Sequence, residues 1–273
     1  MPPDYRRVPH LPIAVHPLVL ALDHGLDSRG TAAALEGGQN VLFLAGGASE
    51  PAINVVKAAL AANRDRYVVA AAPSLGLFAG SYSRCVDHWC RTLGIESLDV
   101  LFALGIGRTA SWSSGVTDRL AQLRSSGRVG RIGAGLRNRK HLAVLLDSPL
   151  VDFLVVPYSA AQRGAEREVF PFLEARRQAN LRTPVVIASE ATFSRALLRR
   201  PAKHEGRIPT AADCYRFCLA SPDVGLVFTG PRNLERAREN LAAFREAGPL
   251  RPHEIEWISH FGDVVRQYEG ADD

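Results

Sequence analysis

Short apolar runs alternate along this chain with longer stretches whose apolar residues recur at helical spacing. Several of the runs are continuously apolar instead of alternating with polar residues. That pattern is typical of parallel strands that are covered by helices. The pattern predicts strands at residues 18–23, 40–45, 67–72, 98–104, 130–134, 152–157, 184–189 and 225–229.

A helical segment is predicted in almost every interval between these strands. The exception is 28–38, where the pattern is so poor that we expect a short or degraded helix. A further amphipathic segment, 252–267, should pack outside the strands. Eight strand-helix steps favour a closed (β/α)8 TIM barrel over an open sheet, and the absence of Gly/Pro-rich linkers predicts one domain, 1–273. The predicted helices are 51–62, 84–93, 116–125, 139–146, 166–179, 211–220 and 234–247.

The net charge of +5 and the pI near 9.3 come from arginine, since Lys57, Lys140 and Lys203 are the lysines. The arginines are scattered and are not interleaved with aromatic residues, so nucleic-acid binding is not expected. No apolar stretch is long enough for a signal peptide or a membrane span, so a membrane is not an expected partner. Homo-oligomerisation is left open.

The four cysteines fall in two pairs inside predicted helices, which suits buried thiols better than disulfides. A reducing cytoplasm is therefore the expected compartment. Asp87, His88 and His204 invite a metal interpretation, but no metal-ligand spacing occurs among them, and we predict no metal site.

Segment 229–244, TGPRNLERARENLAAF, resembles the last barrel strand and helix of the aldo-keto reductases. Four other segments resemble motifs of the same family and occur in the same order: HWCRTLGIESLD at 88–99, LRSSGRVGRIG at 123–133, DFLVVPY at 152–158 and GPLRPHE at 248–254. The resemblance implies the (β/α)8 barrel of that superfamily with an extra C-terminal helix.

In the aldo-keto reductases the equivalent of this last helix holds the adenosine half of NADP(H). The resemblance therefore implies a cofactor-binding role for Gly230, Arg232, Arg236, Glu239 and Asn240. Arginine suits a phosphate dianion because its guanidinium forms forked hydrogen bonds. Alternatively, Arg236 and Glu239 form an ordinary surface pair, and the helix is retained by descent alone. We expect that no cofactor is used, with NADP(H) as the open alternative.

The catalytic tetrad of the aldo-keto reductases, Asp-Tyr-Lys-His, does not transfer to this chain. The aspartate position falls on Phe43, the lysine position near Ala72 and the histidine position on Leu104. The segment that should contain the tyrosine is shortened to 46–50, GGASE. The resemblance thus implies a divergent member that lacks the tetrad.

Polar residues at the carboxyl ends of the predicted strands are the remaining candidates for chemistry, because barrel active sites lie there. Asp23 and His24 follow the first strand, and Glu190 follows the seventh. A carboxylate and an imidazole together supply a general acid and base. Each could equally be a rim residue without a catalytic role. Further candidates at or near the mouth are Tyr82, Arg108 and Tyr158.

These features favour a repurposed enzyme that acts on a small organic metabolite by cofactor-independent acid/base chemistry, as a lyase, isomerase, dehydratase or cyclase. One alternative is a non-catalytic NADP(H)-binding or regulatory pseudoenzyme. Another is an NADPH-dependent reductase with a non-standard proton donor.

Overall fold

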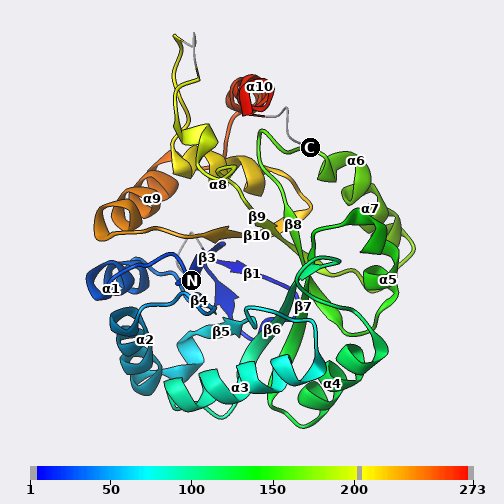
Figure 1. Ribbon diagram of the computed structural model, residues 1–273. Helices are drawn as coiled ribbons and strands as arrows, with labels where there is room; N and C mark the ends of the chain where they lie inside the picture. The colour runs from blue at the N-terminus through cyan, green and yellow to red at the C-terminus, as the bar shows by residue number, and fades with distance from the viewer. Residues whose placement is uncertain (1–4, 202–204, 270–273) are drawn as a thin grey trace.

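The computed structural model describes residues 5–201 and 205–269, and its centre is a closed barrel of eight parallel strands (Figure 1). Each strand pairs with the next in the chain, and the last pairs with the first, so the predicted barrel is confirmed. The strands are β3 (Leu18–Ala21), β4 (Val41–Leu44), β5 (Val68–Ala71), β6 (Leu98–Ile106), β7 (Val129–Leu136), β8 (Val151–Pro157), β9 (Val185–Ser189) and β10 (Val224–Thr229).

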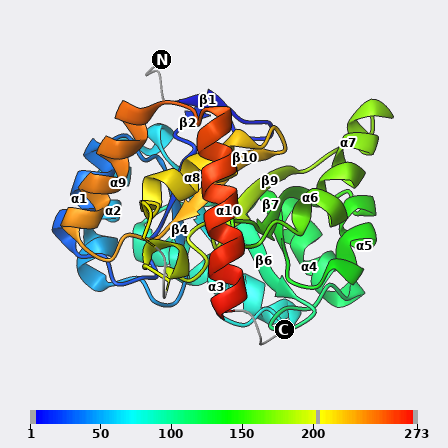
Figure 2. The ribbon, with the colours of Figure 1, turned by 90° about the horizontal axis from the view of Figure 1, so that it is seen from above.

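Helices surround the barrel and cover the outward faces of its strands (Figure 1). The C-terminal helix α10 (Pro252–Glu269) lies across the outside next to α8, as predicted (Figure 2). The other helices are α1 (Ser28–Glu36), α2 (Glu50–Ala62), α3 (Ala79–Leu93), α4 (Ser114–Ser125), α5 (Leu142–Asp147), α6 (Ala165–Glu168), α7 (Phe170–Gln178), α8 (Ala211–Ala220) and α9 (Leu234–Ala247), with short 3₁₀ turns η1 (Arg64–Arg66), η2 (Arg139–His141) and η3 (Ala196–Leu198).

One helix begins earlier than predicted, and another is short, as predicted. Helix α1 has nine residues and is regular, because Asp27 caps it by accepting a hydrogen bond from the Gly30 amide at 2.7 Å. The glycine that follows α1 lets α9 approach closely: a Cβ at Gly37 would lie 2.4 Å from a methyl carbon of Leu241. Helix α3 begins at Ala79, before the predicted start at residue 84.

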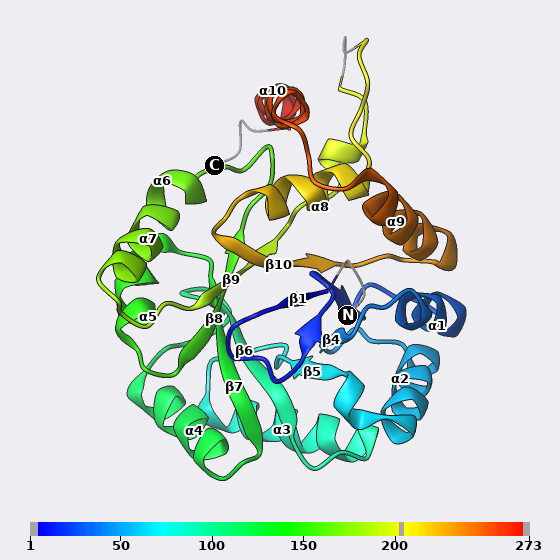
Figure 3. The same ribbon diagram turned by 180° about the vertical axis from the view of Figure 1, so that it is seen from behind.

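A short hairpin closes the amino-terminal end of the barrel (Figure 3). It consists of β1 (Arg6–Arg7) and β2 (Ala14–Val15), and its apolar residues pack into the same core as the inward-facing side chains of the strands. Higher in that core, Phe43 and Phe228 meet edge to face with ring centroids 5.0 Å apart. The hairpin thus fills the amino-terminal end of the barrel, and the open space lies at the carboxyl ends of the barrel strands.

Asp152, at the start of β8, links several segments at the amino-terminal end of the barrel. Its side chain is 1% exposed and accepts a hydrogen bond from the Ile132 amide at 2.9 Å. Arg182 donates to the same carboxylate at 2.6 Å, and Arg124 and His10 lie 3.5 and 3.8 Å from it. A buried carboxylate is tolerated here because it is both paired and hydrogen-bonded.

Candidate functional site

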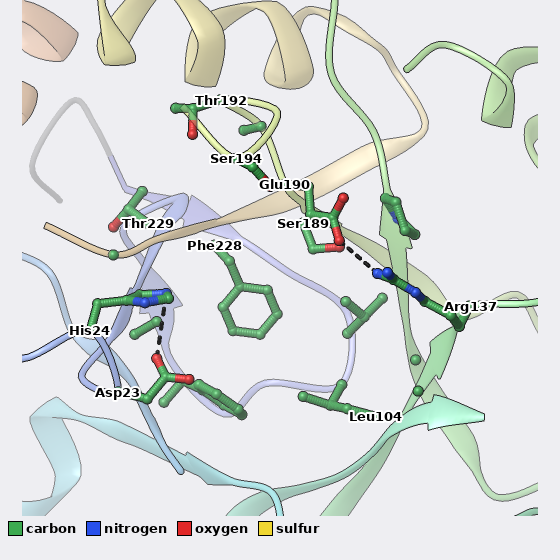
Figure 4. A pocket seen from close by; sticks show the side chains of 18 of the residues that line it. Asp23, His24, Leu104, Arg137, Ser189, Glu190, Thr192, Ser194, Phe228 and Thr229 are labelled. Atoms are coloured by element: carbon green, nitrogen blue, oxygen red, sulfur yellow. Dashed lines mark hydrogen bonds and ion pairs between the residues drawn. The ribbon is translucent and has the colours of Figure 1, made fainter. Parts of the chain in front are cut away.

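A cavity of about 690 Å³ opens at the carboxyl ends of the barrel strands (Figure 4). We call it the mouth cavity. Inward-facing side chains of the strands make an apolar floor, and loop residues make a polar rim. The floor is formed by Ala21, Phe43, Leu104, Val155 and Phe228.

Asp23 and His24 form one polar wall of the mouth cavity, directly after β3. The His24 Nε2 atom lies 3.6 Å from Asp23 Oδ1. That oxygen is buried and accepts no hydrogen bond from the part of the chain that the structure describes. Gly230 fixes the imidazole from behind, since a Cβ at this position would lie 1.9 Å from His24 Cδ2. Only a residue without a side chain allows this packing.

Glu190 and Arg137 form the facing wall. Arg137 Nη1 donates a hydrogen bond to Glu190 Oε1 at 2.8 Å. Figure 4 shows this pair on the other side of the Phe228 ring from Asp23 and His24. The mouth cavity therefore places two polar pairs opposite each other above an apolar floor.

The loop after β9 has an unusual backbone. Glu190, Phe193, Ser194 and Arg195 all have positive φ between 48° and 73°, a conformation that costs energy for residues other than glycine. Hydrogen bonds hold the turn, including one from the Phe193 amide to the Glu190 carbonyl at 2.7 Å. As a result Ser194 and Arg195 line the mouth cavity.

Four of the six residues predicted as catalytic candidates line the mouth cavity: Asp23, His24, Arg108 and Glu190. Asp23 and His24 are adjacent, whereas Glu190 faces them across the floor and is engaged by Arg137. The expectation that barrel sites lie at the carboxyl ends of the strands thus located these four residues from the sequence.

Tyr82 does not lie in a loop at the mouth, so that prediction is wrong. It belongs to α3, is fully buried, and its hydroxyl donates to the Gly76 carbonyl at 3.0 Å. Burial raises the pKa of the Tyr82 phenol. The side chain fixes the loop before α3 from inside the core.

Tyr158 also points away from the mouth cavity. Pro157 lines the mouth, so the next residue faces outward, because side chains alternate along a strand. The Tyr158 hydroxyl donates to Glu166 at 2.8 Å, and its ring stacks on Phe217 with centroids 5.7 Å apart. It lines a separate outer groove that also includes Ile255 of α10.

A second cavity, of about 640 Å³, extends from the mouth cavity between α8 and the start of α9. We call it the side groove. Gly230 and Arg232 line both cavities, and Arg236, Glu239 and Asn240 line the side groove. Arg236 pairs with Glu239 at 2.8 Å, the surface pair foreseen as the alternative to phosphate binding.

Tyr215 was not predicted as a site residue, yet it lines both cavities from α8. It is 5% exposed, and Asn240 Nδ2 lies 3.5 Å from its hydroxyl oxygen. Burial raises the pKa of Tyr215, so its phenol stays protonated at neutral pH. Tyr215 lies on a helix and not at a strand end, so the sequence pattern did not indicate that it belongs to the site.

Among the described residues, no group of three or more His, Cys, Asp or Glu side chains could hold a metal ion. Cys85, Cys90, Cys214 and Cys218 are free and buried. Within the described ranges, no helix is both long and apolar enough to cross a membrane.

No family model and no curated protein match this sequence. Solved structures do match in fold. The holo form of aldo-keto reductase AKR11C1 from Bacillus halodurans superposes with a TM-score of 0.74 at 19% identity, covering 94% of this chain and 96% of that one. This chain has the aldo-keto reductase fold.

Two further matches support the same fold. An aldo-keto reductase from Klebsiella pneumoniae in complex with NADPH gives a TM-score of 0.72 at 20% identity over 92% of each chain. The glycerol dehydrogenase AKR11B4 from Gluconobacter oxydans gives 0.74 at 15% identity over 100% of this chain and 98% of that one.

Two positions that the aldo-keto reductase resemblance assigned to tetrad residues lie in the floor of the mouth cavity: Phe43 and Leu104. Ala72 is buried after β5, and Ser49, in the shortened tyrosine segment, caps α2. No lysine is among the described residues that line the mouth cavity or the side groove. Lys203 and His204 lie outside the described residues.

Proposed function

We propose that this chain is a divergent member of the aldo-keto reductase superfamily that has lost hydride transfer. It acts on a small organic molecule by acid/base chemistry, as a lyase, isomerase, dehydratase or cyclase. The fold, the ordered sequence motifs and the apolar residues at the tetrad positions support the proposal. Barrels of this kind change their chemistry through their loops.

The proposal rests on Asp23 Oδ1, which accepts no hydrogen bond from the described residues and has the His24 imidazole 3.6 Å away. A buried carboxylate oxygen without a hydrogen-bond donor costs free energy, and a substrate hydroxyl or a water would supply the missing donor. Asp23 then serves as the proton acceptor, and His24, 3.6 Å away, is the second group that can exchange a proton with the substrate. Glu190 faces the same space and is the second carboxylate available to the substrate.

A conversion experiment tests this function. Protein dialysed free of nucleotides is incubated with a bacterial metabolite extract from which nucleotides have also been removed, and consumed and formed compounds are identified by mass spectrometry. We expect a product that equals its substrate in mass or is lighter by one water, or two products whose masses sum to that of the substrate. The conversion should disappear in Asp23→Asn and persist in Asp118→Asn, which changes an exposed carboxylate on α4.

The proposal fails if Asp23→Asn converts as fast as the wild type. It also fails if every product differs from its substrate by two hydrogen atoms and forms only when NADPH is added, because that pattern is a reduction.

The side groove favours a second candidate function, the binding of NADP(H) by a regulatory protein or by a reductase with another proton donor. Arg232, at the junction of the two cavities, has no ion pair within the described part of the chain. Arg232, Arg236 and Asn240 would hold the adenosine end with its phosphates. Bound NADPH supplies a hydride, and Tyr215 of α8, which lines both cavities and whose pKa is raised by burial, would be the protonated phenol available.

Arg236→Ala tests this candidate. If NADP(H) occupies the side groove, the substitution weakens NADP(H) by about 1.5–3 kcal/mol, since it removes a hydrogen bond to a charged phosphate. NAD(H) binding changes little, because NAD(H) lacks the 2′-phosphate. Arg238→Ala is the matched control, because Arg238 is exposed on the same helix and lines neither cavity. Equal weakening of both nucleotides would show that Arg236 does not contact the phosphate.

A further inference from the structure

The rim of the mouth cavity carries an excess of positive charge. Four arginines line it against two carboxylates, which leaves a formal excess of two positive charges with His24 neutral. Charged side chains that surround one concave space raise the local concentration of ligands of opposite sign. The ligand of this cavity should therefore be an anion. The arginines are Arg108, Arg137, Arg195 and Arg232, and the carboxylates are Asp23 and Glu190.

Two of the arginines stand together at the ends of neighbouring strands. Ile106 of β6 pairs with Leu136 of β7, and Arg137 follows Leu136 directly, while Arg108 lies just beyond Ile106. Their loops touch, because a Cβ at Gly107 would lie 2.7 Å from a ring carbon of His141. The two arginines therefore lie on adjoining loops and line the same cavity.

Backbone hydrogen bonds hold the turn that contains Arg108. The amide of Arg108 donates to the Gly105 carbonyl at 3.0 Å, and the amide of Gly107 donates to Ala110 at 3.2 Å. Gly105 and Gly107 both have positive φ, of 75° and 88°, which allows the tight turn. The Arg108 guanidinium itself forms no ion pair or hydrogen bond with any residue that the structure describes.

Arg137 already shares its charge with Glu190, so the full uncompensated charge at this wall is that of Arg108. One such charge at this wall matches one carboxylate, and the second excess positive charge of the rim lies with Arg195 and Arg232, which Asp23 offsets in part. Arginine holds a carboxylate through two parallel hydrogen bonds.

The floor next to this turn is aromatic. Leu104 precedes Gly105 directly, and the Phe228 ring lies in the cavity between the two polar walls (Figure 4). Phe228 already meets Phe43 and Phe102 edge to face, at 5.0 and 6.1 Å. Another ring fits this cluster well, because aromatic rings pack favourably at such separations.

We propose that the mouth cavity binds an aromatic carboxylate, with its ring against Phe228 and Leu104 and its carboxylate held by Arg108, assisted by Arg137. This inference rests on the proposed function in one respect, that the mouth cavity is the substrate site. The far edge of the ring then points across Phe228 to Asp23 and His24, which places the reacting position away from the carboxylate.

Benzoate and its neutral counterpart benzamide test the proposal, by titration calorimetry on the full chain. Wild type should bind benzoate, and benzamide should bind at least about tenfold more weakly, because it cannot form the charge-assisted pair. Arg108→Ala should weaken benzoate by about tenfold or more and leave benzamide unchanged. Arg119→Ala is the matched control, because Arg119 is exposed on α4 and lines neither cavity.

Equal affinity for benzoate and benzamide would overturn the inference, as would an Arg108→Ala variant that binds benzoate like the wild type. Inorganic phosphate that displaces benzoate completely at equal concentration would show that the site selects a dianion instead. The proposed function is judged separately. If benzoate binds through Arg108 but the extract assay shows no conversion, the acid/base function is wrong and the carboxylate site stands. If the Asp23–His24 pair converts a neutral substrate, the carboxylate site is wrong and the acid/base function stands.

Discussion

Replacing Gly230 by alanine should drive His24 out of its position next to Asp23. The new methyl carbon would lie 1.9 Å from His24 Cδ2 and 2.7 Å from Nε2. Non-bonded carbons pack about 3.5–4.0 Å apart, so the imidazole must move by roughly 1.6 Å or more. The φ of Gly230 is not in the left-handed region, so the backbone itself accepts alanine.

The cost in stability should be small, because the His24 side chain is 48% exposed and can turn towards solvent. We expect Gly230→Ala to lower the free energy of unfolding by under about 1 kcal/mol and to abolish the conversion that depends on Asp23. Urea-induced unfolding measures the first quantity and the extract assay measures the second.

A double-mutant cycle isolates the contact between the two residues. In a His24→Ala background the methyl group meets no ring, so Gly230→Ala should cost about 0.5–1 kcal/mol less than in the wild type. Two results would refute the reasoning: an unchanged conversion in Gly230→Ala, or a cost that is the same in both backgrounds.

Three further outcomes are expected. Asp152→Ala should lower the free energy of unfolding by about 1–3 kcal/mol, because it leaves the Ile132 amide without its acceptor and removes the carboxylate that Arg182 contacts. Asp147→Ala, at a carboxylate that is 76% exposed, should have little effect, and equal urea midpoints for the two variants would contradict this. Burial lowers the pKa of His10 below its ordinary 6.5. The contribution of neutral His10 to stability is therefore present above pH 6.5 and is lost as the pH falls through the folded-state pKa. In His10→Asn the free energy of unfolding should fall less steeply on the acid side of its pH profile. With a panel of aldehydes and ketones, absorbance at the NADPH band should not fall, and turnover above background would show that hydride transfer survives.

The sequence predicted the barrel because parallel strands covered by helices are continuously apolar, as in β4 and β5. The periodicity at α1 was poor because small buried residues such as Gly30 and Ala34 replace the large apolar side chains on which periodicity depends, and the helix is short, as predicted. The start of α3 was misplaced because Phe78, its capping residue, offers no polar side-chain cap.

The site residues also divide into those that the sequence located and those that it did not. Asp23, His24, Arg108 and Glu190 lie within three residues of the end of a strand, so the strand ends alone located them. Tyr158 also follows a strand, yet its side chain points outward because side chains alternate along a strand. A continuously apolar run does not show which of its residues is the last to face the inside of the barrel.

Two site residues gave no sequence indication at all. Tyr215 reaches the cavities from a helix on the outside of the barrel. Arg195 reaches them through a left-handed turn at residues that rarely adopt one. Neither position follows from a local pattern, because both depend on how distant segments pack.

Calorimetric titration of the full chain with NADPH tests the central claim most directly, since that claim is chemistry without a nicotinamide cofactor. The account predicts no saturable heat of binding in the micromolar range that is usual for a dedicated cofactor. Saturable, stoichiometric binding that Arg232→Ala weakens and Arg238→Ala does not would contradict the account and establish the side groove as an NADP(H) site.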